Sequence, residues 1–153
     1  MPTVVRVAPD ILRPDAELAG FLERLSGEGA VASFVGLARG IAKDGSGVSE
    51  LFLDHYPGMT ETSIEAIAND ALRRFDVSNV LVVHRCGSLE PGEAIVVVAA
   101  ASLHRRAAFL AADYLMDRLK TEAAFWKRED TADGSRWIEP TDDDRADRAR
   151  WSD

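Results

Sequence analysis

Two lysines seven residues apart, Lys120 and Lys127, stand in the stretch LKTEAAFWKRE at residues 119–129. The chain has 18 basic residues, and arginine supplies nearly all of them. A lysine ammonium loses its proton when other cations crowd it, which a guanidinium does not do in practice. If Arg39, Arg105 or the other lysine lies nearby, these lysines can transfer a proton or act as nucleophiles. The alternative is that both are exposed surface lysines, the usual state of this residue type.

A second group of cations marks the start of the longest helical pattern in the chain. His104, Arg105 and Arg106 directly follow an apolar run. The N-terminus of a helix favours anions through its free N–H groups and its dipole, so two added guanidiniums favour an anion site there. Arg106 could equally be a solvated surface charge. Near the other end of this helix we assign Arg118 a structural role, because cations stabilise a helix C-terminus.

Several familiar catalytic motifs are absent from the sequence. It has no phosphate-binding glycine-rich loop, no GxSxG and no CxxC. His55, His84 and His104 fall in separate elements without metal-ligand spacing, so we interpret them as structural and predict no metal and no cofactor. Cys86 ends an apolar run and is interpreted as a small strand residue, since nothing marks it as an activated thiol.

Length and charge restrict the class of protein. With 153 residues the chain is predicted to form one domain over 1–153, ending in an acidic tail at 141–153. The net charge of −8 argues against nucleic acid and acidic membranes as partners. A single cysteine indicates a reducing compartment, and neither a signal peptide nor a membrane span is recognisable. We therefore expect a cytoplasmic protein.

Hydrophobic periodicity predicts a mixture of strands and helices. The helix over 103–123 is expected to bury one face made of Phe109, Ala112, Leu115, Met116 and Leu119. A mobile loop is expected at 40–47, a hairpin with Gly134 at its turn after residue 124, and a last helix in the tail. This mixture favours an α+β fold over a doubly wound parallel sheet. The other predicted elements are strands at 3–9, 29–39, 48–56, 79–89 and 93–102 and helices at 13–29 and 57–75.

Several long stretches resemble, in order and spacing, the large catalytic subunit family of molybdopterin synthase. These stretches are GAVASFVGLAR, LDHYPGMTE, VVHRCGSLEPGE, SLHRRAAFLAADYLMDRLKTEAAFWKRE and RWIE, within residues 29–139. The resemblance implies an α/β hammerhead fold with an additional antiparallel β subdomain. It also implies an enzyme of molybdenum cofactor biosynthesis, which transfers sulfur from the C-terminal thiocarboxylate of a small ubiquitin-like carrier subunit to cyclic pyranopterin monophosphate. The implied assembly is a homodimer with one small subunit at each end, a heterotetramer.

The same resemblance implies which residues form the site. Lys120 and Lys127 occupy the places of two catalytic lysines, with Lys120 close to the inserted carrier tail. Some pocket residues would come from the opposite protomer of the homodimer. Arg39, His104 and Arg105 match positions that bind the anionic phosphate or the carrier terminus. Phe34 and Met116 match apolar positions that line the same region.

Two departures from the family pattern concern the edges of this site. Residues 40–42 read Gly-Ile-Ala where family members often have a polar or charged residue. After RWIE the chain has Pro140-Thr141 in place of a basic residue, for which Arg145 is a candidate substitute.

Two rival functions follow from the same residues. A non-catalytic anion-binding or adaptor domain could use arginine throughout, so the lysine pair argues against it. A hydrolase that uses Cys86 or His104 lacks an oriented base or nucleophile in the sequence.

Overall fold

The computed structural model describes residues 2–152, which form two four-stranded β-sheets and four helices. One sheet pairs β1 with β4 in parallel and is otherwise antiparallel, whereas the second sheet is antiparallel throughout. This mixture confirms the α+β class and the separate antiparallel part. In spatial order the first sheet contains β1 (Thr3–Ala8), β4 (Asn79–Arg85), β6 (Ala94–Ser102) and β2 (Ala30–Leu37), and the second contains β5 (Gly87–Leu89), β3 (Val48–His55), β7 (Phe125–Thr131) and β8 (Gly134–Ile138).

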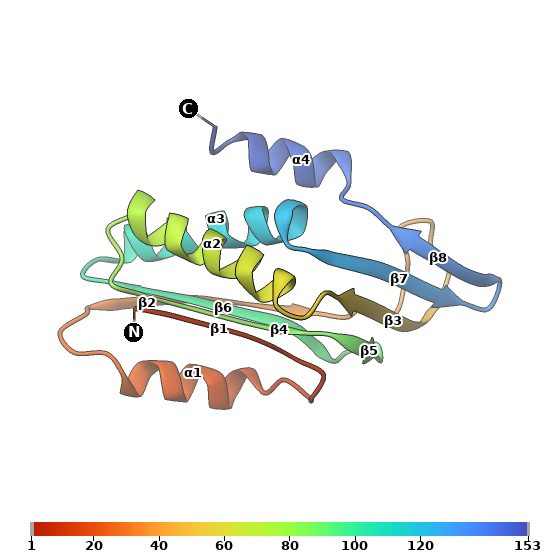
Figure 1. Cartoon of the computed structure of the whole chain (residues 1–153), viewed down its shortest axis with the longest axis horizontal. Coiled ribbons are helices and arrows are strands. Elements are labelled where there is room, and N and C mark those ends of the chain that lie inside the picture. The colour runs from red at the N-terminus through yellow and green to blue at the C-terminus, as the bar shows by residue number, and fades with distance from the viewer. Residues whose placement is uncertain (1, 153) are drawn as a thin grey trace.

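Helices cover both faces of the first sheet (Figure 1). On one face lies α1 (Pro14–Glu23), and on the other lie α2 (Met59–Arg74) and α3 (Arg105–Glu122). The last helix, α4 (Asp142–Ala149), packs against α3 and follows the second sheet in the chain. In the described residues no helix is long and apolar enough to cross a membrane.

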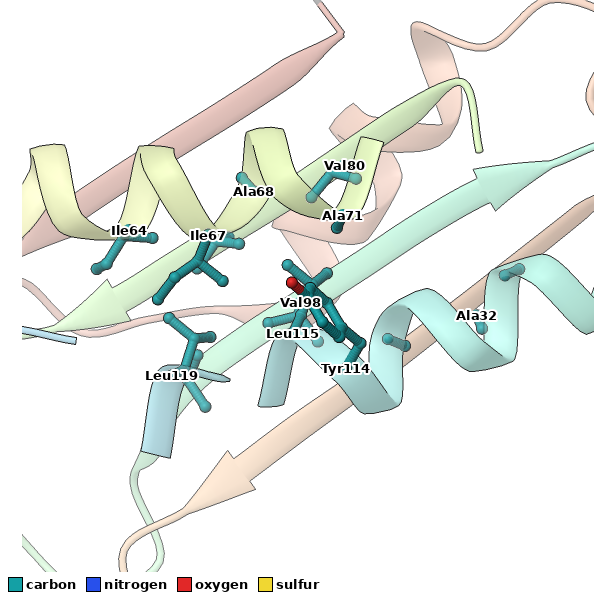
Figure 2. Close-up of a cluster of buried hydrophobic side chains, with 14 residues drawn as sticks. Ala32, Ile64, Ile67, Ala68, Ala71, Val80, Val98, Tyr114, Leu115 and Leu119 are labelled. Atoms are coloured by element: carbon teal, nitrogen blue, oxygen red, sulfur yellow. The ribbon is translucent and has the colours of Figure 1, made fainter. Parts of the chain in front are cut away.

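The central strand β6 explains this layered arrangement. Its uninterrupted apolar sequence AIVVVAAAS is buried on both faces, as expected for a strand between two layers of helices. Val96 and Val98 face α2 and α3, where they join the core that Figure 2 shows around Ile67 and Leu115. Residues 97, 99 and 101 face α1 and pack around Phe21. The alternation of a strand therefore assigns successive β6 residues to two separate cores.

The buried face of α3 differs from the one predicted. Leu115 is fully buried and Leu119 and Ala112 are buried, but Phe109 is 62% exposed. At about 100° per residue, Phe109 lies roughly 120° around the helix from Leu115, so the two cannot share a narrow face. Small residues, including Ala108, take the place next to the sheet instead.

The predicted strand over 79–89 is in fact two strands in different sheets. Cys86 separates β4 from β5, and Gly87 follows it with a φ of 83°. A residue that has a Cβ rarely adopts such a φ angle, so the glycine at this position allows the chain to turn from one sheet to the other. The helix predicted over 13–29 is shorter than expected and ends at Glu23. It begins with Pro14, and proline is favoured at the first position of a helix.

Three shorter predictions are confirmed. Strands β7 and β8 form a hairpin with Gly134, at φ 123°, at its turn. Residues 40–47 form a loop apart from one isolated bridge between Ile41 and Gly47, while the mobility expected of this loop stays a prediction. The acidic tail contains α4, whose start is closed by a capping box between Thr141 and Asp144.

Candidate active site

One cavity of about 680 Å³ lies where the C-terminal end of α3 meets the second sheet. Its wall is drawn from β2, β7, the loop at 40–47 and the segment from Ile138 into the start of α4. These segments are far apart in sequence and meet because β7 leaves α3 and pairs with β3. The lining residues that carry charge or matched the predicted site are Phe34, Arg39, Lys43, His84, Met116, Lys120, Lys127, Glu129, Glu139, Asp143 and Asp144.

The structure brings five of the seven predicted site residues into this cavity wall, namely Phe34, Arg39, Met116, Lys120 and Lys127. The two lysines reach the cavity from different elements, one from the last turn of α3 and one from β7.

The other two, His104 and Arg105, do not line the cavity. They lie at the N-terminal end of α3, about 22 Å along the helix axis from Lys120 at 1.5 Å per residue. Both are exposed, and neither forms an ion pair with another described residue. Within one chain, His104 and Arg105 therefore form a separate basic patch.

Lys127 is held in the middle of the second sheet. It pairs with Leu53 on β3 and with Ile138 on β8, and directly paired residues of antiparallel strands share a face. Burial, followed by the positive charge of Lys120, lowers the pKa of the Lys127 amine, and the Asp144 carboxylate offsets this only in part. Such an amine gives up its proton more readily than an ordinary lysine, which suits proton transfer.

Lys120 has a different environment. Its side chain is 52% exposed, and its Nζ lies 3.6 Å from Asp144 Oδ1 at the start of α4. Asp144 Oδ2 accepts a hydrogen bond from the backbone N–H of Thr141. Burial acts to raise the pKa of Asp144, but this hydrogen bond and the charge of Lys120 outweigh it and leave the pKa below its ordinary value. Lys120 and Lys127 therefore differ: Lys127 is half-buried in the second sheet, whereas Lys120 is more exposed and has a carboxylate partner.

A neutral histidine borders the lysines. His84 is buried on β4, stacks on Phe125 at 4.2 Å between ring centroids, and has Nδ1 2.7 Å from the carbonyl oxygen of Arg85. Because a carbonyl only accepts, Nδ1 carries the proton in this contact. Burial, and secondarily the charge of Lys127, lowers the pKa of His84 to about 4.

The charges of the cavity wall are balanced. Four cationic side chains are opposed by four carboxylates, two of which come from the first turn of α4. The wall therefore becomes distinctly basic only if the contribution of α4 is left out. The basic residues are Arg39, Lys43, Lys120 and Lys127, and the acidic ones are Glu129, Glu139, Asp143 and Asp144.

The position of α4 is set by contacts with α3. The Trp151 indole N–H donates to Asp117 Oδ2 at 2.7 Å, and Arg150 Nη2 donates to the same oxygen at 2.7 Å. The Trp151 ring packs edge-on against Phe75 and Tyr114. With the ion pair between Arg148 and Glu122, these contacts hold α4 against α3 and keep Asp144 beside Lys120. We call this set of contacts the α4 clasp.

Among the cavity residues that were not identified from the sequence, Lys43, Asp144 and His84 carry different signals. Lys43 could have been found by the same scarcity of lysine that drew attention to Lys120 and Lys127. Asp144 carries the signal Thr-x-x-Asp of a capping box before a helix. His84 was interpreted as structural, and only its place next to β7 brings it to the cavity.

The structure also places several residues that lie outside the predicted site. Arg145 does not line its own chain's cavity and pairs with Asp142 at 3.6 Å. Phe125 packs inward, but Trp126 is 54% exposed. Cys86 is buried, and burial raises the pKa of its thiol, which argues against a thiolate nucleophile. Among residues 2–152 no group of three or more His, Cys, Asp or Glu side chains is arranged to hold a metal.

Fold and site together define an α+β protein with a two-lysine cavity between its sheets. Residues 11–122 match the family model described as "MoaE protein". The chain is 48% identical over 151 residues to the molybdopterin synthase catalytic subunit of Ralstonia nicotianae, covering 99% of this chain and 85% of that protein.

Solved structures agree with this match. The fold superimposes with a TM-score of 0.83 on the molybdopterin biosynthesis MoaE protein from Burkholderia ambifaria, at 42% identity and 99% coverage of each chain. A complex of subunits 1 and 2 of molybdopterin-converting factor from Helicobacter pylori shares the fold, with a TM-score of 0.71 at 18% identity over 90% of each chain. The chain belongs to the MoaE family, as the resemblance had implied.

Proposed function

We propose that this chain acts as the catalytic subunit of a molybdopterin synthase and that the two-lysine cavity is where sulfur is added to the pterin precursor. The observation that carries this assignment is the convergence of Lys120 and Lys127, from separate elements, on one cavity with the pKa of Lys127 lowered. Membership of the MoaE family supplies the reaction class.

The proposed substrates are cyclic pyranopterin monophosphate and the thiocarboxylated C-terminus of a small carrier subunit. Both are anionic, and the cavity offers the guanidinium of Arg39 and the ammonium of Lys120 to bind them. The thiocarboxylate sulfur forms a bond to a pterin side-chain carbon, and water releases the carrier as a carboxylate. Each departing oxygen of the substrate needs a proton, which a lysine ammonium such as Lys127 can donate.

The proposed assembly is a homodimer that carries a small subunit at each end, in the cytoplasm. Two features of the chain support a second protomer. Strand β2 is an edge strand with Phe34, Val35 and Leu37 exposed, and such an edge invites pairing or covering. His104 and Arg105 are also too far from the cavity of their own chain to serve it, so they are assigned to the cavity of the partner.

The direct test combines the purified chain, its own thiocarboxylated small subunit and cyclic pyranopterin monophosphate, and measures dithiolene product. Product is expected with the wild-type chain and not with a small subunit that ends in an ordinary carboxylate. Absence of product in the complete mixture, with both proteins folded and associated, would refute the proposed function.

A further inference from the structure

Among the described residues, Asp144 is the only carboxylate that forms an ion pair with Lys120 or Lys127. It approaches Lys120 from α4, and it lies beyond the residues 11–122 that match the family model. Its two oxygens have separate tasks: Oδ2 accepts the Thr141 N–H at 3.0 Å, and Oδ1 faces the Lys120 ammonium at 3.6 Å. The carboxylate is thus fixed in orientation by the helix cap before it meets the lysine.

The α4 clasp fixes the position of Asp144 beside Lys120, because it holds α4 against α3. Asp117, which is only 8% exposed, accepts from both Trp151 and Arg150 on the C-terminal side of α4. Thr141 closes the helix at its other end. A helix of eight residues anchored at both ends cannot move its first turn away from Lys120 without breaking one of these contacts.

We propose that Asp144 is a positioning residue of this site: it holds the Lys120 ammonium in the cavity wall as a fixed cation, which leaves Lys127 as the lysine that exchanges a proton. The proposal deepens the proposed function and rests on it for the activity readout, but not for the titration described below.

The electrostatic consequence has a definite direction. Two ammonium groups that share a cavity disfavour each other's charge, and a carboxylate between them relieves this. Removal of the Asp144 charge therefore lowers the pKa of Lys127 further, because Asp144 acts to raise it. Other charged or titratable side chains in the wall also face the lysines: His84 on β4, Glu129 on β7, Arg39 and Lys43 before β3, and Glu139 and Asp143 after β8.

The variant that isolates this effect is Asp144→Asn. Asparagine keeps an oxygen that can accept the Thr141 N–H, so the helix cap is retained while the charge is removed. The matched control is Asp142→Asn, which removes the same charge from the same helical turn. Asp142 pairs with Arg145, is fully exposed and does not line the cavity.

The test follows the lysine side chains directly. The sequence contains three lysines, so protein labelled with ¹³C-lysine gives three side-chain signals, which single lysine substitutions assign. In Asp144→Asn the titration midpoint of Lys127 is expected to move to lower pH, because the carboxylate that acts to raise its pKa is gone. Asp144→Glu should restore it and Asp142→Asn should leave it in place. An unchanged midpoint in Asp144→Asn, or an equal shift in Asp142→Asn, would overturn the proposal.

A second variant guards against loss of structure in the first. Lys120→Met should move the Lys127 midpoint to higher pH, because the charge of Lys120 lowers it. A midpoint that does not respond to Lys120→Met would also refute the coupling on which the proposal depends.

The activity arm separates this inference from the proposed function. With the complete assay, the limb of the pH–rate profile that depends on Lys127 should shift to lower pH in Asp144→Asn and return in Asp144→Glu. An active wild type with superimposable profiles contradicts the role of Asp144 alone. An inactive wild type contradicts the proposed function, while the titration still decides the coupling.

Discussion

The two ends of α3 present cations in opposite ways. At its C-terminal end, Lys120 lies in a cavity beside a second lysine and an acid held there by the α4 clasp. At its N-terminal end, His104 and Arg105 are exposed and have no ion-pair partner among the described residues. The first end has its electrostatic environment built by its own chain, and the second has a site only if another molecule supplies the rest.

This difference shows how one helix can serve two sites. Between its ends, α3 packs Leu115 into the core that it forms with the first sheet and α2 (Figure 2), and Ala108 belongs to the same core. That packing fixes the spacing of the two cationic groups along a rigid rod. If the chain forms a homodimer, one helix contributes proton transfer to its own cavity and anion binding to the cavity of its partner.

The largest expected effect is at the cavity end. Lys127→Ala and Lys120→Ala should each lower the rate of dithiolene formation by roughly 10²–10⁴-fold, the usual contribution of a positioned proton donor. Turnover with the thiocarboxylated small subunit measures the loss, and far-UV circular dichroism checks that the fold persists. Arg73→Ala is the matched control, since Arg73 is a largely exposed cation on α2. Near-normal turnover in either lysine variant removes that residue from the mechanism.

A substitution in the buried middle of α3 should lower the stability of the whole fold, on which both ends of the helix depend. Leu115→Ala creates a cavity in the core, and we expect it to lower the free energy of unfolding by about 3 kcal/mol. Phe109→Ala, on the exposed face, should change it by less than about 0.5 kcal/mol. Urea denaturation measures both values. Equal losses would mean that the face originally predicted, which included Phe109, is the buried one.

Acid should lower the free energy of unfolding through His84, which borders the cavity. The folded-state pKa of His84 is lowered to about 4, so the imidazole is neutral when folded, whereas the unfolded chain binds a proton near the ordinary value of 6.5. Stability is therefore full above about pH 6.5 and declines as pH falls towards 4, with about 1 kcal/mol lost between pH 6.5 and 5.5. Chemical denaturation at both pH values should show this loss in the wild type and less of it in His84→Gln.

The smallest effect tests whether the N-terminal end serves a second chain. Lys120→Ala and Arg105→Ala should both be poorly active alone. Mixing and reassociation should recover about a quarter of wild-type activity, because half of the dimers are mixed and each of those has one intact site. Recovery is measured in the dithiolene assay against each variant mixed with itself. No recovery, despite verified subunit exchange, would place Arg105 and Lys120 in the same site or leave Arg105 without a role.

Local patterns predicted most of the fold. The α2 stripe that includes Ile64 and Ile67 is buried as its 3.6-residue period indicates, and the hairpin at Gly134 follows from turn chemistry. The strand over 79–89 was predicted too long, because its apolar pattern continues through a position where the chain changes sheets. Phe109 was assigned to the core because periodicity grouped it on one helical face with Leu115, whereas the core instead contains Ala108 and Ala112.

The site was predictable only in part, for a physical reason. Residue type and the family motif identified Lys120 and Lys127 as a pair. The two residues lie close together because only seven positions separate them in the sequence. The partnership of Lys120 with Asp144 depends on where α4 docks, and that position depends on the contact between Trp151 and Asp117, two residues that are 34 positions apart in the sequence. Contacts of this kind are set by tertiary packing and leave no periodic signal.

The residues of the cavity wall are spread along the chain from Phe34 to Asp144, and this affects the order in which the protein folds during its synthesis. The first sheet and its helices can assemble as soon as α3 has been synthesised, because every element of that layer precedes residue 123. The second sheet and α4 join only when the later residues are free of the ribosome, and domains fold progressively as the chain emerges. A nascent or truncated chain that ends after α3 would therefore contain the first sheet and its helices but would lack Lys127. The cavity that holds both Lys120 and Lys127 is the last part of the protein to form.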